Sequence, residues 1–224
     1  MAAPRPPLLH RDDPAREPLG GNVKVTREDW LAVALDALVS DGVEQVKVLA
    51  LAERLDVSRS SFYWYFKSRQ DLLDALLRHW QTTNTAAIVA QSELPAATIT
   101  GAVCNVHRCV VNPALFDTAL DFAIRDWGRR SGKVRRILDQ SDARRLAALT
   151  AMFERYGYEP TEALTRARVL YYMQLGYDLA QPEEPTAFRL SLVPHYLLVF
   201  TGQPGTPEEI AEFAAYARRF WPDG

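Results

Sequence analysis

Residues 58–73 read SRSSFYWYFKSRQDLL, and this stretch carries the strongest fold signal in the chain. Phe62 and Phe66 are four residues apart, so they share one helical face and can anchor a short helix in a core. Three further aromatic side chains occupy positions 63–65. Only one or two of three consecutive helical residues can face inward, so packing alone does not explain them. The stretch predicts a short helix with an aromatic outer face.

A second short helix precedes this one. Residues 49–55 have an amphipathic pattern, and Asp56-Val57-Ser58 forms a tight turn before the next helix, which we expect over 59–66. Two short helices joined in this way form a helix-turn-helix, whose second helix fits the DNA major groove. From Ser58 to Arg69 there are three basic residues and no acidic one, although residues 22–83 hold 8 Lys and Arg against 9 Asp and Glu. The positive charge is therefore concentrated where phosphates would lie.

Outward from this motif, the apolar period stays helical. Thr26 with Asp29 predicts a capping box that starts a helix, and Asp41-Gly42 predicts its end. The alternating segment 43–48 would also fit a strand. We expect an all-α protein of about ten helices, and the later ones are predicted at 68–80, 96–111, 116–127, 134–156, 160–179, 186–200 and 206–221, with a kink or restart near Pro194.

Composition sets the class of protein. The chain has 224 residues, a net charge of −2 and two cysteines. The length supports a sizeable core, the cysteine count excludes a disulfide scaffold, and the near-neutral charge argues against coating of nucleic acid by bulk charge. No secretory signal is visible, and the longest stretch without charged residues, 190–207, is too broken by proline and glycine to span a membrane. We expect a cytoplasmic protein that does not enter membranes.

The first 21 residues contain five of the fourteen prolines and read as a disordered leader. Three arginines in it could follow a DNA minor groove. Interleaved acidic residues cancel their charge, which favours an inert tail instead. The arginines concerned are Arg5, Arg11 and Arg16.

From about Thr26 to Trp80 the chain resembles the TetR (tetracycline-repressor) family of bacterial regulators, on the stretch SRSSFYWYF followed by KSRQDLL. The resemblance implies a DNA-binding head at 22–67 and a helical domain for effector binding and dimerisation at 68–224. It implies that Phe62 and Phe66 are core residues and that Tyr63 and Lys67 bind phosphates. The expected DNA-binding residues are Thr26, Lys47, Ser58, Arg59, Ser60, Ser61, Tyr63, Trp64, Tyr65, Lys67 and Arg69.

Two positions depart from the family pattern. Lys47 stands where Ser or Thr often caps the second helix, which weakens the cap but adds a cation for phosphate. Asp56 stands at the usual turn glycine. Asp tolerates left-handed backbone better than most residues, so we expect the turn to form.

The second half predicts two further surfaces. The helix at 161–179 is apolar on more than one face and 190–200 is apolar nearly all round, which suggests a four-helix interface with a second copy. The alternative is two central core helices of a monomer. The expected interface residues are Val169, Tyr172, Gly176, Leu190, Val193 and Leu197. Candidate pocket residues, each of which could equally be plain core, are Trp80, His107, Phe116, Phe122, Trp127, Tyr171 and Met173.

Other chemistry has little support in the sequence. Cys104 and His107 share a helical face, but Cys109 lies about 140° from Cys104, so one regular helix cannot bring the three to a metal. No nucleophile elbow or phosphate loop is present, and we expect no cofactor and no catalytic site. The expected function is a homodimeric repressor that an aromatic or lipophilic effector releases from a palindromic operator. The alternative is an all-α ligand-binding protein or enzyme with a vestigial head.

Overall fold

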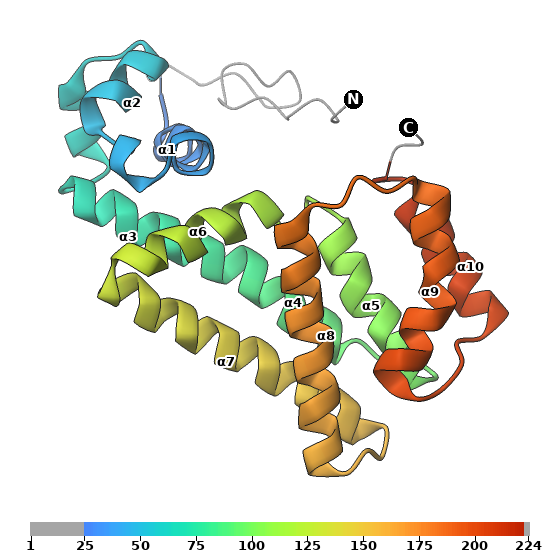
Figure 1. The fold of residues 1–224 in the computed structure, drawn as a ribbon. Coiled ribbons are helices and arrows are strands. Elements are labelled where there is room, and N and C mark those ends of the chain that lie inside the picture. The colour runs from blue at the N-terminus through green and yellow to red at the C-terminus, as the bar shows by residue number, and fades with distance from the viewer. Residues whose placement is uncertain (1–24, 222–224) are drawn as a thin grey trace. The chain divides into compact units, whose positions relative to one another are not determined.

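The computed structural model describes residues 25–221, and the described part contains ten α-helices and no β-strand (Figure 1). The prediction of an all-α fold is confirmed. The helices are α1 (Arg27–Asp41), α2 (Val48–Leu55), α3 (Arg69–Trp80), α4 (Ala86–Glu93), α5 (Ile99–Val111), α6 (Thr118–Arg130), α7 (Gly132–Arg155), α8 (Pro160–Ala180), α9 (Thr186–Thr201) and α10 (Pro207–Ala217). The leader, with its three arginines, lies outside the described residues.

Three shorter helical segments complete the chain. Two are 3₁₀-helices, η2 (Val43–Gln45) and η3 (Arg59–Trp64), and one is a π-helix, η4 (Gln81–Thr85). The segment that could have been a strand is therefore a 3₁₀ turn, and the second helix of the motif is 3₁₀ rather than α-helical. In η3 the Ser61 hydroxyl donates to the Ser58 carbonyl at 2.9 Å, a local bond of the kind that competes with regular α-helical pairing.

The chain packs as two compact units. The first, called here the head unit, comprises residues 25–80 and 119–135 of the described chain. The second unit comprises residues 81–118 and 136–221. The head unit thus includes α3 and most of α6 in addition to the helix-turn-helix.

The core of the head unit confirms the predicted anchors. Phe62 and Phe66 are buried and stacked at 5.4 Å between ring centres, and Trp30 meets Phe62 edge-on at 5.3 Å. The predicted capping box starts α1: the Thr26 hydroxyl accepts from the Asp29 backbone N–H at 3.1 Å, and the Asp29 carboxylate accepts from the Thr26 N–H at 2.8 Å. Local caps and a small aromatic core together hold η3 in place.

The turn between α2 and η3 depends on one left-handed residue. Asp56 has φ 54° and ψ 48°, and the following backbone N–H of Val57 donates to the Ala52 carbonyl at 3.1 Å. The expectation that Asp takes the place of a turn glycine is confirmed.

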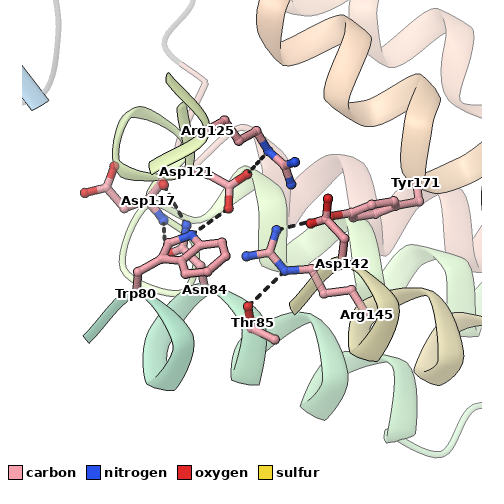
Figure 2. Close-up of polar contacts among 9 residues, drawn as sticks. All are labelled: Trp80, Asn84, Thr85, Asp117, Asp121, Arg125, Asp142, Arg145 and Tyr171. Carbon is pink, nitrogen blue, oxygen red and sulfur yellow. Dashed lines mark hydrogen bonds and ion pairs between the residues drawn. The ribbon is translucent and has the colours of Figure 1, made fainter. Parts of the chain in front are cut away.

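The second unit buries a charged side chain in a polar network (Figure 2). Arg145 on α7 has no exposed surface; its Nε donates to the Thr85 hydroxyl at 3.1 Å and another guanidinium N–H to the Tyr171 hydroxyl at 3.3 Å. The Tyr171 hydroxyl donates in turn to Asp142 at 2.7 Å. A buried cation needs such partners, because losing them leaves its desolvation uncompensated.

Among residues 25–221, no helix combines the length and apolar character that crossing a bilayer requires.

Candidate DNA-binding surface and effector cavity

The outer face of η3 is aromatic and open. Trp64 is 84% exposed and Tyr63 is 50% exposed, whereas Phe62 beside them is fully buried. Arg59 is exposed and donates through its guanidinium to the Tyr63 hydroxyl at 3.1 Å. A protein does not leave an indole in water for packing reasons, so this face is available to a partner.

Small and cationic residues surround this face. Ser58 and Ser60 are exposed and share a hydrogen bond at 2.8 Å, and Ser61 is half-buried. Lys67 is exposed just after η3. Lys47 is the N-cap of α2, as expected, and makes no side-chain cap; its Nζ donates to Gln45 at 3.3 Å. Both ammonium groups can therefore reach an anion.

Two expected DNA-binding residues make hydrogen bonds within the head unit. Arg69 donates to the carbonyls of Val43 and Val46, at 2.6 Å each, and so holds η2 against the start of α3. The Tyr65 hydroxyl donates to the Val25 carbonyl at 2.8 Å, at the entry to α1. These bonds join residues more than twenty positions apart, which local sequence reasoning could not foresee.

Thr26 is half-buried, and its hydroxyl donates to the Asp29 carboxylate at 2.8 Å.

One exposed apolar residue of the head was not among the expected site residues. This residue is Leu49, which is 59% exposed in the first turn of α2. The amphipathic pattern of α2 offered no separate signal for it.

A cavity of about 240 Å³ lies within the second unit, between α5, α8 and α9 and beside Phe213 of α10 and Trp221. Its wall is mostly apolar. Of the predicted pocket residues, His107 and Met173 line it. The volume suits a small organic molecule.

The other predicted pocket residues lie elsewhere. Phe116 and Tyr171 are buried in the core of the second unit and do not line the cavity. Trp80, Phe122 and Trp127 belong to the head unit, where the Trp80 indole N–H donates to Asp121 (Figure 2). Large aromatic side chains are buried both in the core and on the wall of a cavity. Their size and aromatic character in the sequence therefore do not distinguish core residues from lining residues.

The lining residues that sequence reasoning missed come mainly from α9 and the C-terminal end. They include Tyr196 and Phe200 of α9, Phe213, Trp221 and Arg189. The sequence predicts that residues 190–200 form an interface, because they are apolar nearly all round. One of their faces in fact lines the cavity.

His107 is one of the polar residues that line the cavity. Its Nδ1 lies 3.0 Å from the Val103 carbonyl oxygen, one turn earlier on α5. Burial lowers the pKa of His107, so the imidazole is neutral at physiological pH. Its ring stacks on Phe200 at 5.6 Å and 24° and meets Phe213 edge-on at 6.4 Å.

Acidic side chains on the cavity wall are engaged by neighbours. The Tyr177 hydroxyl donates to Glu184 at 2.7 Å, and the Gln174 amide donates to Asp178 at 2.8 Å. Burial and the bond to the Glu184 carboxylate raise the pKa of Tyr177 to about 12, which keeps its hydroxyl protonated.

The cation on the wall is Arg189. Its guanidinium carbon lies 3.5 Å from the centre of the Trp221 ring and 5.6 Å from that of Tyr177. A guanidinium over an indole face gains cation–π attraction.

The outer faces of α8 and α9 expose apolar side chains. Of the predicted interface residues on α8, Val169 and Tyr172 are nearly half exposed and Gly176 is exposed. The expected α9 residues are placed differently: Leu190 and Leu197 are buried in their own unit, and Val193 and Leu197 line the cavity. The outward apolar residues of α9 are Phe188, Leu198 and Val199. The reason is helical phase, since positions 190, 193 and 197 share the inward face.

Neither cysteine shows a reactive environment. Cys104 lines the cavity, Cys109 is buried in the core, and burial raises the pKa of both thiols to about 12. Within residues 25–221, no group of three His, Cys, Asp or Glu side chains could hold a metal ion.

Known proteins share both the head and the fold. Residues 31–76 match the family model described as bacterial regulatory proteins, tetR family. The tetracycline repressor protein class C of Escherichia coli is 33% identical over 89 residues, which are 39% of this chain and 41% of that protein. The nucleoid occlusion factor SlmA of Haemophilus influenzae (strain PittGG) is 29% identical over 107 residues, 47% of this chain and 44% of that protein. The matches thus span less than half the length of these relatives.

Two solved structures resemble the chain over most of its length. Salmonella enterica GusR has a TM-score of 0.55 at 16% identity and covers 87% of this chain and 94% of its own. Mycobacterium smegmatis AmtR has a TM-score of 0.57 at 15% identity, and the match covers 90% of this chain and 97% of that structure's chain. At such identities the likeness is one of fold. Residues 31–76 therefore match the tetR family of bacterial regulatory proteins, and the likeness over the rest of the chain is one of fold.

Proposed function

We propose that this protein is a homodimeric transcriptional repressor that binds a palindromic DNA operator and releases it when a small molecule occupies the cavity of the second unit. The observation that carries the DNA-binding part is the outer face of η3. On this face of the tetR-type head, the indole of Trp64 is 84% exposed and lies beside two exposed cations, Arg59 and Lys67.

The expected contacts divide by chemistry. In this proposal phosphate is bound by Lys47, Lys67 and the Tyr63 hydroxyl, which supplies affinity without sequence information. Ser60 and Trp64 are placed to approach base edges in the major groove, where an apolar ring can contact a thymine methyl group. Arg69 and Tyr65 support this surface through their bonds to the backbone of the head unit.

Dimerisation is proposed through the outer faces of α8 and α9. A face that includes Tyr172 and Val199, at 45% and 66% exposure, is more apolar than a monomer surface needs. Two heads related by a two-fold axis can grip successive major grooves when they are about 34 Å apart. A palindromic operator follows from that symmetry.

Release by an effector requires that the ligand bind the two states of the protein with different affinity. The cavity supports such a role because most of its wall is apolar, while polar groups such as His107 and Arg189 also line it. In this mechanism ligand binding changes the separation of the two heads, so that they no longer match adjacent grooves.

The test is selection of bound sequences from a random DNA pool, followed by footprinting of the selected duplex with the purified protein. The expected footprint has two half-sites related by a two-fold axis, and log K falls steeply with log salt concentration. Trp64→Ala should reduce the preference for the selected sequence over random DNA, while Arg218→Ala, an exposed change in the second unit, should not. Failure to enrich any sequence would contradict the proposal.

A further inference from the structure

Three rings form a continuous stacked wall in the cavity. Tyr196 stacks on Phe200 at 5.8 Å between ring centres and 10° between planes. Phe200 stacks in turn on His107, at 5.6 Å and 24°. All three residues line the cavity, and they come from two helices, α5 and α9. Such a wall favours a flat aromatic ligand, because offset stacking adds to the gain from burial.

The hydrogen bond at one end of this wall determines the tautomer of His107. The Nδ1 atom lies 3.0 Å from the Val103 carbonyl oxygen, which can only accept. Nδ1 therefore carries the proton, and Nε2 has a free lone pair. Within the described chain nothing donates to Nε2. Nε2 is not among the fully buried polar atoms that lack a partner, so it keeps accessible surface at the cavity that His107 lines, where a ligand hydroxyl can donate to it.

The charges of the wall do not select a charged ligand. The two carboxylates accept hydrogen bonds from Gln174 and Tyr177, and the guanidinium of Arg189 rests on Trp221. An anionic ligand would face two carboxylates, and a cationic one would face the guanidinium. An uncharged ligand avoids both repulsions.

We propose that this cavity binds an uncharged aromatic alcohol, whose ring packs against the aromatic wall and whose hydroxyl donates to Nε2 of His107 in the plane of the imidazole. The proposal rests on the proposed function only in treating the cavity as the effector site. It narrows the ligand to one that combines a flat apolar body with a single hydrogen-bond donor.

The probes are 2-naphthol, 2-methoxynaphthalene and 2-naphthoate, and binding to the full chain is measured by titration calorimetry without DNA. The first two share a ring system, but only 2-naphthol can donate. We expect 2-naphthol to bind about tenfold tighter than 2-methoxynaphthalene, the ratio that one additional hydrogen bond to the ligand gives. The anion 2-naphthoate should bind more weakly than 2-naphthol.

His107→Phe keeps a flat ring but removes the acceptor, so it should bring the ratio between the first two probes close to one. His195→Phe is the matched control, because His195 is exposed on α9 and does not line the cavity. It should leave the ratio unchanged.

Four results would overturn the proposal: equal affinity of the wild-type protein for the first two probes, a ratio that persists in His107→Phe, tighter binding of 2-naphthoate, or no binding of any probe. The wild-type comparison decides the matter even if His107→Phe does not fold. A separate titration with the selected operator distinguishes the two proposals. If 2-naphthol binds with the expected ratio but leaves DNA affinity unchanged, the ligand class stands and the release mechanism is contradicted.

Discussion

The indole N–H of Trp80, at the end of α3, donates a 2.8 Å hydrogen bond to the carboxylate of Asp121 on α6, forty-one residues later in the chain. Asp121 is almost fully buried, and its other carboxylate oxygen accepts from Nε of Arg125 at 2.8 Å. The tryptophan that sequence reasoning placed in an effector pocket thus ties two helices of the head unit together.

Removal of this carboxylate should destabilise the head unit. Asp121→Ala leaves a buried indole N–H and the Arg125 guanidinium without this acceptor, so we expect a loss of about 2–4 kcal/mol in the free energy of unfolding. Urea unfolding followed by circular dichroism measures it. Asp126→Ala breaks an exposed ion pair with Arg130 and should cost less than about 1 kcal/mol. Equal losses in the two variants would contradict this account.

The turn at Asp56 can be tested through its backbone conformation. Asp56→Val puts a β-branched residue at φ 54° and should cost about 1–2 kcal/mol of stability. Asp56→Gly fits the left-handed region without strain, and its stability should stay within about 1 kcal/mol of wild type. Thermal melts of the two variants give the comparison. A valine variant as stable as the glycine variant would show that the turn is not strained.

The phosphate role of Lys67 predicts a change in salt dependence. Lys67→Ala should weaken binding to every DNA sequence and lower the slope of log K against log salt concentration by about 1. Fluorescence anisotropy with labelled operator, over a range of salt concentrations, measures both. Arg218→Ala is the control and should leave the slope unchanged. An unaltered slope in Lys67→Ala would remove this residue from the phosphate contacts.

The exposed apolar residues on the outer face of α9 predict a dimer that dissociates when a charged residue is substituted into this face. Val199→Asp should shift the protein from dimer to monomer at micromolar concentration, because two unpaired carboxylates would be buried at the two-fold interface. Sedimentation velocity reports the mass. Leu94→Asp changes an exposed leucine outside α8 and α9, at 41% exposure against 66% for Val199, and this variant should remain dimeric. A monomeric wild-type protein would contradict the proposed interface.

Sequence reasoning succeeded where structure depends on neighbouring residues. The capping box at Thr26, the left-handed turn at Asp56 and the inward pair Phe62 and Phe66 are confirmed. Each depends on hydrogen bonding, backbone conformation or helical spacing within a few residues. The same reasoning did not foresee the bonds of Arg69 and Tyr65, whose partners lie 23 to 40 positions away.

By itself, the sequence determined the all-α fold and the helix-turn-helix head, because caps, turns and helical periodicity are local properties. Only the tertiary structure decided which apolar residues line the cavity, which fill the core and which remain exposed on α8 and α9. Apolar burial has no direction and scales with the area removed from water, so an apolar residue does not specify its neighbour. His107 and Val199 illustrate the difference: packing places one on a cavity wall and leaves the other open to a partner.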